Sequence, residues 1–492
     1  MFIFITIFGF FAIFFLLRTL RLQNLRHCNC EICHAYITSS WRNDFDNLCD
    51  WYSHLLRRSP TLTIQVHVLN NVITANPDNV EHVLKTRFDN YPKGKQFSDI
   101  LGDLLGRGIF NSDGDTWRFQ RKLSSLELGS VSVRIFAHDI IKNEIEMRLV
   151  PLLNSFGDHG LDLDLQDAFR RFSFDTISKL SFGFDPVCLR LPLTSSELVD
   201  AFDMASTLSA HRALAPSPLF WKIKRFLNIG SEKKLKQSID VINRLVGDLI
   251  KQRRKKGSGM NNNDLISRFM AVVGDDDEYL RDIVVNFLLA GRDTVAAGLT
   301  GFFWLLNRHP EVENRIREEL ERVMGPGLDP VTASFNQMQE MNYLHSTVYE
   351  SMRLLPPVQF DSKFALNNDI LADGTFVESG ARVTYHPYAM GRMDRVWGPD
   401  CEEFRPERWL DSAGKFRPEN PVKYPVFQAG PRVCVGKDMA IMEMKSVAVT
   451  IIRRFEIRVV GSNPISRAPR FAPGLTATVS GGLPIRVRER RG

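Results

Sequence analysis

The sequence is poor in cysteine and nearly balanced in charge, and both features exclude classes of protein. Seven cysteines, an odd number in a chain of 492 residues, imply no disulfide framework and favour a reducing, cytosol-facing environment. The 63 basic and 57 acidic residues give a formal charge of +6, which is no nucleic-acid signature but suits anionic lipid or an acidic partner. No internal repeat or internal domain boundary is visible, although the length alone would suggest two or three domains.

The first residues form a run of Phe, Ile and Leu that has no basic residue before it. It also lacks a small-residue cleavage site, so a cleaved signal peptide is not favoured. At about 1.5 Å per residue the run spans roughly 25 Å, just short of a hydrocarbon core. Arg18, Arg21 and Arg26 follow at once, so the C-terminal side should stay cytoplasmic. We predict that residues 1–17 are a single-pass transmembrane anchor.

Residues 18–50 are predicted to form a neck, which contains four possible metal ligands. Cys30-x-x-Cys33-His34 formally matches c-type haem attachment, but that chemistry needs export. Zinc is a second alternative, because Cys28 lies close to these three residues, although no second cluster appears. We interpret the segment as a neck of reduced cysteines, because it directly follows a positive-inside anchor.

The segment from Phe427 to Gly436 carries the densest chemistry in the chain. Gly430 and Gly436 bracket Cys434 in a turn before an apolar helix, and they let the backbone approach a flat partner closely. Backbone N–H groups and the helix N-terminus favour a thiolate there. Arg432 is placed to pair with a carboxylate of the same partner, and Phe427 to cover it. The combination predicts a haem, with Cys434 as the axial ligand of its iron.

This segment resembles the haem-binding signature of the cytochrome P-450 family, Phe-x-x-Gly-x-Arg-x-Cys-x-Gly, at every fixed position. The resemblance extends from about Trp51 to the end of the chain. It implies a mainly α fold with small β-sheets, one haem-thiolate catalytic domain over residues 51–492, and haem b as the cofactor. The family's thiolate favours O–O cleavage. O2 is then the oxidant, and since no flavin domain is fused, NADPH-cytochrome P-450 reductase is the expected electron donor.

Two motifs supply charged side chains around the haem. Trp117 and Arg121 lie at i and i+4 on one helix face and resemble the family's Trp-x-x-x-Arg, whose members hold a haem propionate. Glu350-x-x-Arg353, followed by a Pro-Glu-Arg triplet that ends at Arg408, resembles the family's Glu-x-x-Arg and Pro-Glu-Arg. The resemblance implies a buried ionic cluster that fixes the loop below the haem and takes no part in catalysis.

A long helical pattern over residues 281–307 contains the segment Ala290-Gly291-Arg292-Asp293-Thr294. It resembles the family's Ala/Gly-Gly-x-Asp/Glu-Thr. We expect Gly291 to thin the helix so that oxygen and substrate can lie against it. The hydroxyl of Thr294 can hold a water in mid-helix, and Asp293 can relay protons from solvent.

An apolar substrate chamber is predicted from two further stretches. Residues 89–110 read as a glycine-hinged apolar loop, which in the family covers the chamber. The segment after the Glu-x-x-Arg motif passes close to the iron in the family. The candidate wall residues are Leu104, Leu105, Ile109, Phe110, Val358 and Phe360.

Charged residues next to these walls leave alternatives open. Asp361 and Lys363 could point away from the chamber, pair with each other, or contact a polar end of the substrate. Lys93 and Lys95 are candidates for binding a substrate carboxylate at the chamber mouth.

Finer stretches resemble the plant fatty-acid ω-hydroxylase branch and its relatives that oxidise jasmonoyl-isoleucine. These stretches are residues 90–95, 102–110, 357–365, 385–391 and 424–428. The implied function is oxidation of the terminal carbon of an oxylipin or fatty acid. The best candidate reaction converts jasmonoyl-isoleucine or its 12-hydroxy form to the 12-carboxy form. General fatty-acid ω-hydroxylation is the alternative. The expected location is the endoplasmic reticulum membrane, with the catalytic domain in the cytosol.

Two other classes of function stay open. One is a family member that rearranges peroxides without O2 or a reductase, and the other is a non-catalytic haem or lipid-binding protein. Asp293 and Thr294 argue against the first, because such relatives often lack both. Intact Cys434, Thr294 and Glu350 argue against the second.

Overall fold

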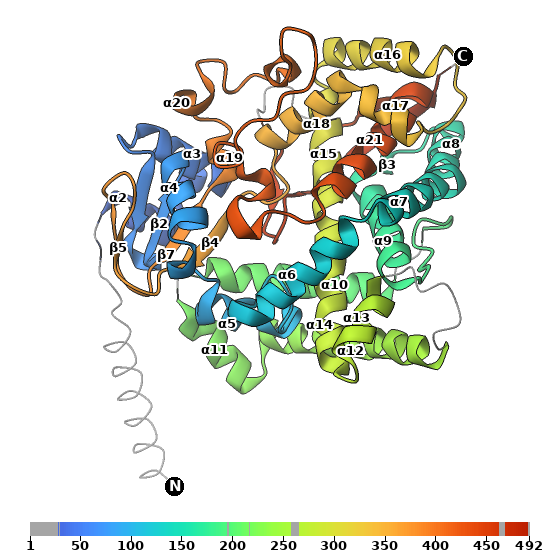
Figure 1. Ribbon diagram of the computed structural model, residues 1–492. Helices are drawn as coiled ribbons and strands as arrows, with labels where there is room; N and C mark the ends of the chain where they lie inside the picture. The colour runs from blue at the N-terminus through green and yellow to red at the C-terminus, as the bar shows by residue number, and fades with distance from the viewer. Residues whose placement is uncertain are drawn as a thin grey trace, which may run out of the picture.

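The structure, a computed structural model, describes residues 28, 30–193, 196–215, 217–256, 265–461 and 468–490. The predicted anchor over residues 1–17 lies outside them. Within these ranges the chain is mainly helical with small β-sheets, as predicted. Figure 1 shows the largest sheet gathered with the N-terminal helices on one side of the molecule and the long helices on the other.

The helices of the first half run from α2 to α12. They are α2 (Glu31–Thr38), α3 (Leu48–Arg58), α4 (Pro77–Glu81), α5 (Gly94–Leu105), α6 (Gly114–Leu128), α7 (Val131–Glu144), α8 (Val150–His159), α9 (Leu165–Phe182), α10 (Glu197–Leu214), α11 (Pro218–Leu227) and α12 (Gly230–Lys256). The second half adds α13 (Leu265–Val273), α14 (Asp277–Leu288), α15 (Thr294–Leu306), α16 (Pro310–Met324), α17 (Phe335–Glu340), α18 (Asn342–Leu354), α19 (Pro387–Met390), α20 (Asp394–Trp397) and α21 (Lys437–Arg454).

The strands form small sheets, of which the largest has the order β1-β2-β7-β4. Its strands are β1 (Thr63–Val66), β2 (Asn71–Thr74), β4 (Asp361–Phe364) and β7 (Arg382–Tyr385). The others pair β3 (Leu163–Asp164), β11 (Pro484–Glu489) and β8 (Phe455–Val459), then β5 (Asp369–Ile370) with β6 (Phe376–Val377), and β9 (Phe471–Ala472) with β10 (Thr478–Val479). Strands β1 and β2 pair antiparallel, and Asn70 just before β2 has the positive φ of a turn residue.

One continuous helix, Asp277–Leu306, runs through the centre and comprises α14, a π-helical turn over Leu289–Asp293, and α15. Among the described residues it is the helix long and apolar enough to cross a membrane, with a mean hydropathy of 1.3. However, 72% of its most apolar stretch of 18 residues is buried inside the protein. It contacts α9, α18 and α21 (Figure 1), as the core helix of a large domain does.

The apolar loop predicted over residues 89–110 is largely a helix, α5. Its apolar residues recur at helical spacing, and Gly94 and Gly106, both with positive φ, lie at its two ends, where they allow the chain to turn. The chain beyond α5 approaches α14 closely. A Cβ added at Gly106 would lie 2.1 Å from the Asp282 carboxyl group, and one at Gly108 would lie 1.9 Å from the side chain of Asn286.

Part of the predicted neck folds onto the domain. In α2, the side chains of Cys33 and Tyr36 are buried in the same apolar cluster as β1 and β2. The Tyr36 hydroxyl donates a hydrogen bond to the Leu214 carbonyl at the end of α10 (2.9 Å). The folded domain therefore begins upstream of Trp51 in the described chain.

Candidate active site

The cysteine loop is built by two short 3-10 turns, Pro425–Phe427 and Gly430–Arg432, before α21. The Cys434 amide donates to the Phe427 carbonyl (2.8 Å), which closes the loop. Gly430 has a φ of 65°, and a Cβ there would lie 2.1 Å from the Leu84 carbonyl oxygen. Glycine is required at this position both by its conformation and by the close approach of two backbones.

The Cys434 thiol lies just before α21 and is accessible. It is the one exposed cysteine among the described residues, yet burial by surrounding protein raises its pKa. The Gly436 amide and Arg121 act in the opposite direction. Burial outweighs them, so the pKa of this thiol lies above its ordinary value, and a metal ion bound at the sulfur would stabilise the thiolate.

The two predicted arginines and Trp117 come together beside this loop. An ion pair of 2.6 Å joins Arg432 to Asp113, and the Arg432 guanidinium lies 4.5 Å from the centre of the Trp117 ring. Arg121 donates to the Val433 carbonyl. Burial lowers the pKa of both arginines, and within the described chain the Nε of Arg432 has no hydrogen-bond partner.

A second group of buried charges lies next to Arg432. Asp361 accepts from Lys93 (2.6 Å) and Lys363 (3.1 Å), so Asp361 and Lys363 pair with each other, one of the three alternatives left open by the sequence. Tyr385 and Gln428 also donate to this carboxylate (3.0 and 2.9 Å). The pKa of Lys363 is lowered well below its usual value by burial and by the charges of Lys93 and Arg432, which outweigh Asp361.

These charges fit haem b. Lys93 pairs with Asp361 and Arg432 with Asp113, while Arg121 and the amine of Lys363, whose pKa its surroundings lower, add further basic groups beside them. Buried charge without a partner is unfavourable. The two propionates of haem b would balance the excess, while Cys434 offers the axial sulfur. The exposed Lys95 pairs instead with Asp99 on its own helix (3.4 Å).

The predicted proton-relay segment lies at the π-helical turn of the central helix. Thr294 donates from Oγ1 to the Ala290 carbonyl (2.6 Å), and both residues are partly accessible. The expected role of Gly291 is wrong, because the missing Cβ does not open space for oxygen. A Cβ there would lie 2.5 Å from Ile177 of α9, so this glycine permits helix packing.

Asp203, which the sequence interpretation missed, completes a charged group beside Thr294. Arg292 is 1% exposed and pairs with Asp203 of α10 (2.6 Å) and with Asp293 (3.3 Å). Burial raises the pKa of Asp293 despite Arg292, which suits a group that exchanges protons. The Asp203 side chain is 39% exposed and links the buried pair to solvent.

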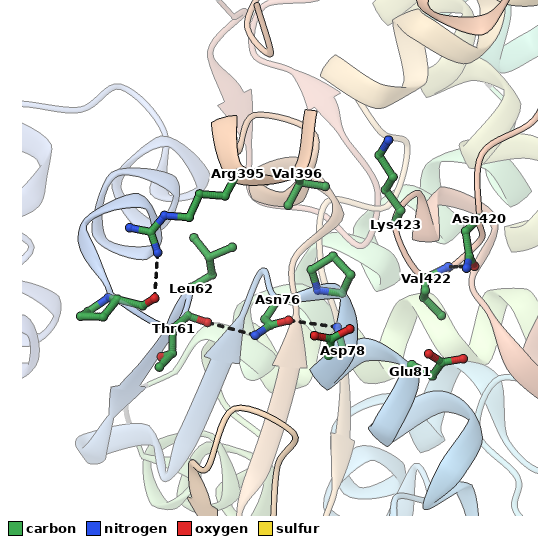
Figure 2. Close-up of a pocket in the computed structure, with 12 residues that line it drawn as sticks. Thr61, Leu62, Asn76, Asp78, Glu81, Arg395, Val396, Asn420, Val422 and Lys423 are labelled. Atoms are coloured by element: carbon green, nitrogen blue, oxygen red, sulfur yellow. Dashed lines mark hydrogen bonds between the residues drawn. The ribbon is translucent and has the colours of Figure 1, made fainter. Parts of the chain in front are cut away.

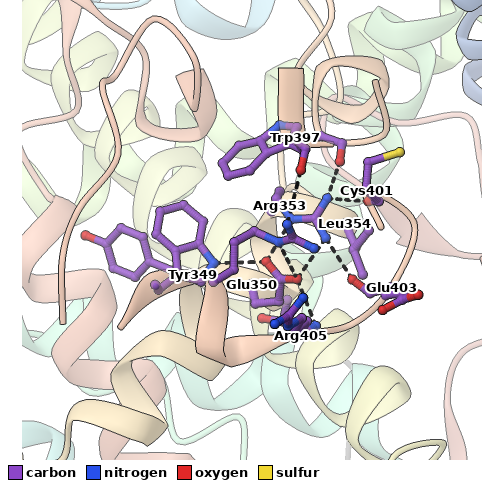
Figure 3. A network of polar contacts seen from close by, with 12 residues as sticks. Tyr349, Glu350, Arg353, Leu354, Trp397, Cys401, Glu403 and Arg405 are labelled. Atoms are coloured by element: carbon purple, nitrogen blue, oxygen red, sulfur yellow. Dashed lines mark hydrogen bonds and ion pairs between the residues drawn. The ribbon is translucent and has the colours of Figure 1, made fainter. Parts of the chain in front are cut away.

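The predicted ionic cluster forms around Glu350 of α18, and Figure 3 shows its contacts. Glu350 accepts two hydrogen bonds from Arg353 (2.7 and 2.8 Å) and one from the Trp409 indole (2.9 Å). The Nε of Arg408 lies 3.4 Å from a carboxylate oxygen of Glu350. Both Glu350 and Arg353 have fully buried side chains, and Arg353 also donates to backbone carbonyls, including that of Glu403 (2.9 Å). The cluster therefore fastens separate loops to α18.

The candidate wall residues divide into two groups. Leu104 and Leu105 are at most 1% exposed and belong to the packed core. Their carbonyls accept from Arg281 and Asn286 of α14 (both 2.9 Å). Phe110, Val358 and Phe360 are partly accessible, as is Ile109. The accessible members can contact a substrate, whereas the two leucines hold α5 in place.

A polar pocket elsewhere on the molecule contains none of the predicted site residues. It has a volume of about 550 Å³ and lies between α4, α20 and the chain before the cysteine loop (Figure 2). Asn76 bridges part of its wall by donating to Thr61 (3.3 Å) and accepting from the Asp78 amide (2.9 Å). Its lining is mixed in charge and carries no chemistry related to Cys434.

Comparison with known proteins agrees with this geometry. The family model described as Cytochrome P450 matches residues 39–478. The chain is 77% identical to Cytochrome P450 94C1 of Arabidopsis thaliana over 98% of each chain. It is 46% identical to Cytochrome P450 94B1 of the same plant, over 92% of this chain and 89% of the relative. It is 40% identical to Cytochrome P450 94A1 of Vicia sativa, over 92% and 88%.

Proposed function

Because the chain belongs to the cytochrome P450 family, we propose that it oxidises the terminal carbon of an oxylipin, with jasmonoyl-isoleucine and its 12-hydroxy form as substrates and the 12-carboxy form as product. Enzymes of this family are monooxygenases that use haem b, O2 and electrons from NADPH delivered by a partner reductase. The observation that carries the substrate proposal is the motif resemblance to the jasmonoyl-oxidising branch, extended by similarity over nearly the whole chain.

The residues of this site have separate tasks. Haem supplies oxygen activation when it is bound through Cys434. Arg121 and Arg432 hold its carboxylates, and Thr294 and Asp293 deliver protons from the side of Asp203. Phe110, Val358 and Phe360 place the alkyl end of the substrate, since position decides between terminal and in-chain attack.

Substrate choice can be tested directly. Full-length enzyme, reductase and NADPH are incubated with 12-hydroxy-jasmonoyl-isoleucine, and the products are identified by mass spectrometry. We expect the 12-carboxy product, because the alcohol formed first still lies at the reacting position. No such product, together with rapid ω-hydroxylation of lauric acid, would assign the enzyme to general fatty-acid metabolism. In that case affinity should rise by about 0.8 kcal/mol, or about fourfold, per added methylene.

Proton delivery predicts a second result. In Thr294→Ala we expect NADPH to be consumed still, hydrogen peroxide to rise, and product per NADPH to fall by about tenfold to 100-fold. Thr300→Ala is a matched control, since Thr300 makes the same bond to the carbonyl four residues back (2.7 Å) but is buried at 1% exposure. Coupling that is unchanged in Thr294→Ala would show that water alone organises the protons.

We also infer that the enzyme is anchored to the endoplasmic reticulum by residues 1–17. Helix α11 supports a membrane location, because Phe220 and Phe226 are 67% and 89% exposed beside Lys222 and Lys224. A truncation that starts at Cys28 should move part of the protein to the soluble fraction without loss of haem. Adding F220S/F226S should release most of the remainder. Glycosylation of a reporter fused at Gly492 would contradict a cytosolic domain.

A further inference from the structure

Three cysteines that take no part in the chemistry above converge where α2 begins. The sulfur atoms of Cys28, Cys30 and Cys33 all lie within 4.8 Å of one another. None forms a disulfide. Cys33 is fully buried, and the other two are half-buried. The sequence favours a neck of reduced thiols and leaves zinc as a second alternative, and the structure adds the mutual approach of the three sulfur atoms.

Local structure explains this approach. Cys30 is the N-cap of α2, and its sulfur accepts a hydrogen bond from the Cys33 amide (3.5 Å). A spacing of three residues places Cys30 and Cys33 on the same face of the first turn. Cys33 packs in the apolar cluster that also contains β1 and β2, and Cys28 and Cys30 pack against that cluster. The three sulfurs are therefore held against a folded sheet.

Their chemistry selects a narrow set of ligands. Thiolates are soft donors that prefer Zn²⁺ and Cu⁺ over Mg²⁺, Ca²⁺ or Mn²⁺. With metal–sulfur bonds of about 2.3 Å, three bound sulfurs lie about 3.8 Å apart, so small side-chain rotations would complete the site. In the part of the chain that the structure describes, no His, Asp or Glu joins the group, and His34 is exposed. A fourth coordination position is left to solvent.

We propose that Cys28, Cys30 and Cys33 bind one thiophilic closed-shell ion, Zn²⁺ or Cu⁺, at a site separate from the haem. Each thiol releases its proton to solvent as its sulfur binds the metal. The bound ion fixes the start of α2 against the sheet, so the chain leaves the catalytic domain at a rigid point.

The test uses the full-length haem protein in detergent. Element analysis should find about one zinc or copper per haem iron in the wild type and none in C28S/C30S/C33A. Haem content should be equal in the two proteins. C188S is the matched control, because Cys188 is a buried free cysteine outside the group, and it should keep the metal. X-ray absorption at the zinc and copper edges should identify the ion and show a sulfur shell at about 2.3 Å.

Three results would overturn the site. One is a wild type without zinc or copper after growth with either metal, and another is equal metal in C28S/C30S/C33A. The third is a Cys30–Cys33 disulfide in protein whose thiols were trapped with iodoacetamide at lysis. If the triple variant does not fold, the wild type can be titrated with a mercurial reagent that blocks thiols. The amount of metal released should then rise in proportion to the number of blocked thiols, up to three.

Discussion

Replacing Cys434 with alanine is expected to abolish both monooxygenase activity and the absorption band of the thiolate-ligated, reduced carbon monoxide complex. Cys434 is the exposed cysteine among those described, and it lies in the glycine-bracketed loop beside Arg121 and Arg432. Alanine removes the sulfur and leaves the loop geometry, which depends on backbone bonds and on Gly430. The difference spectrum of dithionite-reduced protein measures the effect.

The control for this experiment is Cys30→Ser, which removes a thiol that is far away in sequence and packs against the apolar cluster of β1 and β2. That variant should keep the band and the activity. If Cys434→Ala kept the thiolate band while Cys30→Ser or Cys33→Ser removed it, the axial ligand would lie in the neck and the assignment of the site would fail.

Glu350→Gln is expected to give a protein that folds poorly and retains little haem. The change keeps the shape of the side chain and removes the charge that faces Arg353, whose own side chain is fully buried. An unpaired buried charge costs about 3–5 kcal/mol, against a total stability of about 5–15 kcal/mol for a typical domain. Haem per mole of soluble protein and the urea midpoint of unfolding report the loss.

Glu407→Gln is the matched control for Glu350→Gln, because it removes the same charge from an exposed ion pair in the same region. Glu407 pairs with Arg315, but both side chains are substantially exposed, so the free energy of unfolding should change by at most about 1 kcal/mol. Equal losses of haem in the two variants would show that Glu350 owes its importance to something other than its buried ion pair.

The sequence predicts those parts of the site whose geometry depends on spacing along one element. Glu350 and Arg353 are three residues apart on a helix, and Cys434 is presented by a loop that glycines make tight, so their surroundings follow from local rules. The apolar run that forms the central helix is likewise visible without a structure. The mainly helical fold with small sheets is confirmed by the structure and by the family match.

The parts that sequence could not predict depend on contacts between distant segments. Asp203 meets Arg292 only because α10 crosses the central helix. Gly291 faces Ile177 of α9 and not the site. The carbonyls of Leu104 and Leu105 accept hydrogen bonds from polar side chains of α14, which bind the end of α5. The length and polarity of each segment are compatible with several such pairings, and only the packing selects one.

The excess of buried cations beside the cysteine loop has a consequence for how the enzyme is made in the cell. Lys93 and Arg432 lower the pKa of Lys363 by their positive charges even with Asp361 present, and the two carboxylates of a haem would relieve that repulsion. A ligand that binds only the folded state stabilises it in proportion to its free concentration. We therefore expect the fraction of newly synthesised chain that survives quality control to rise with the supply of haem.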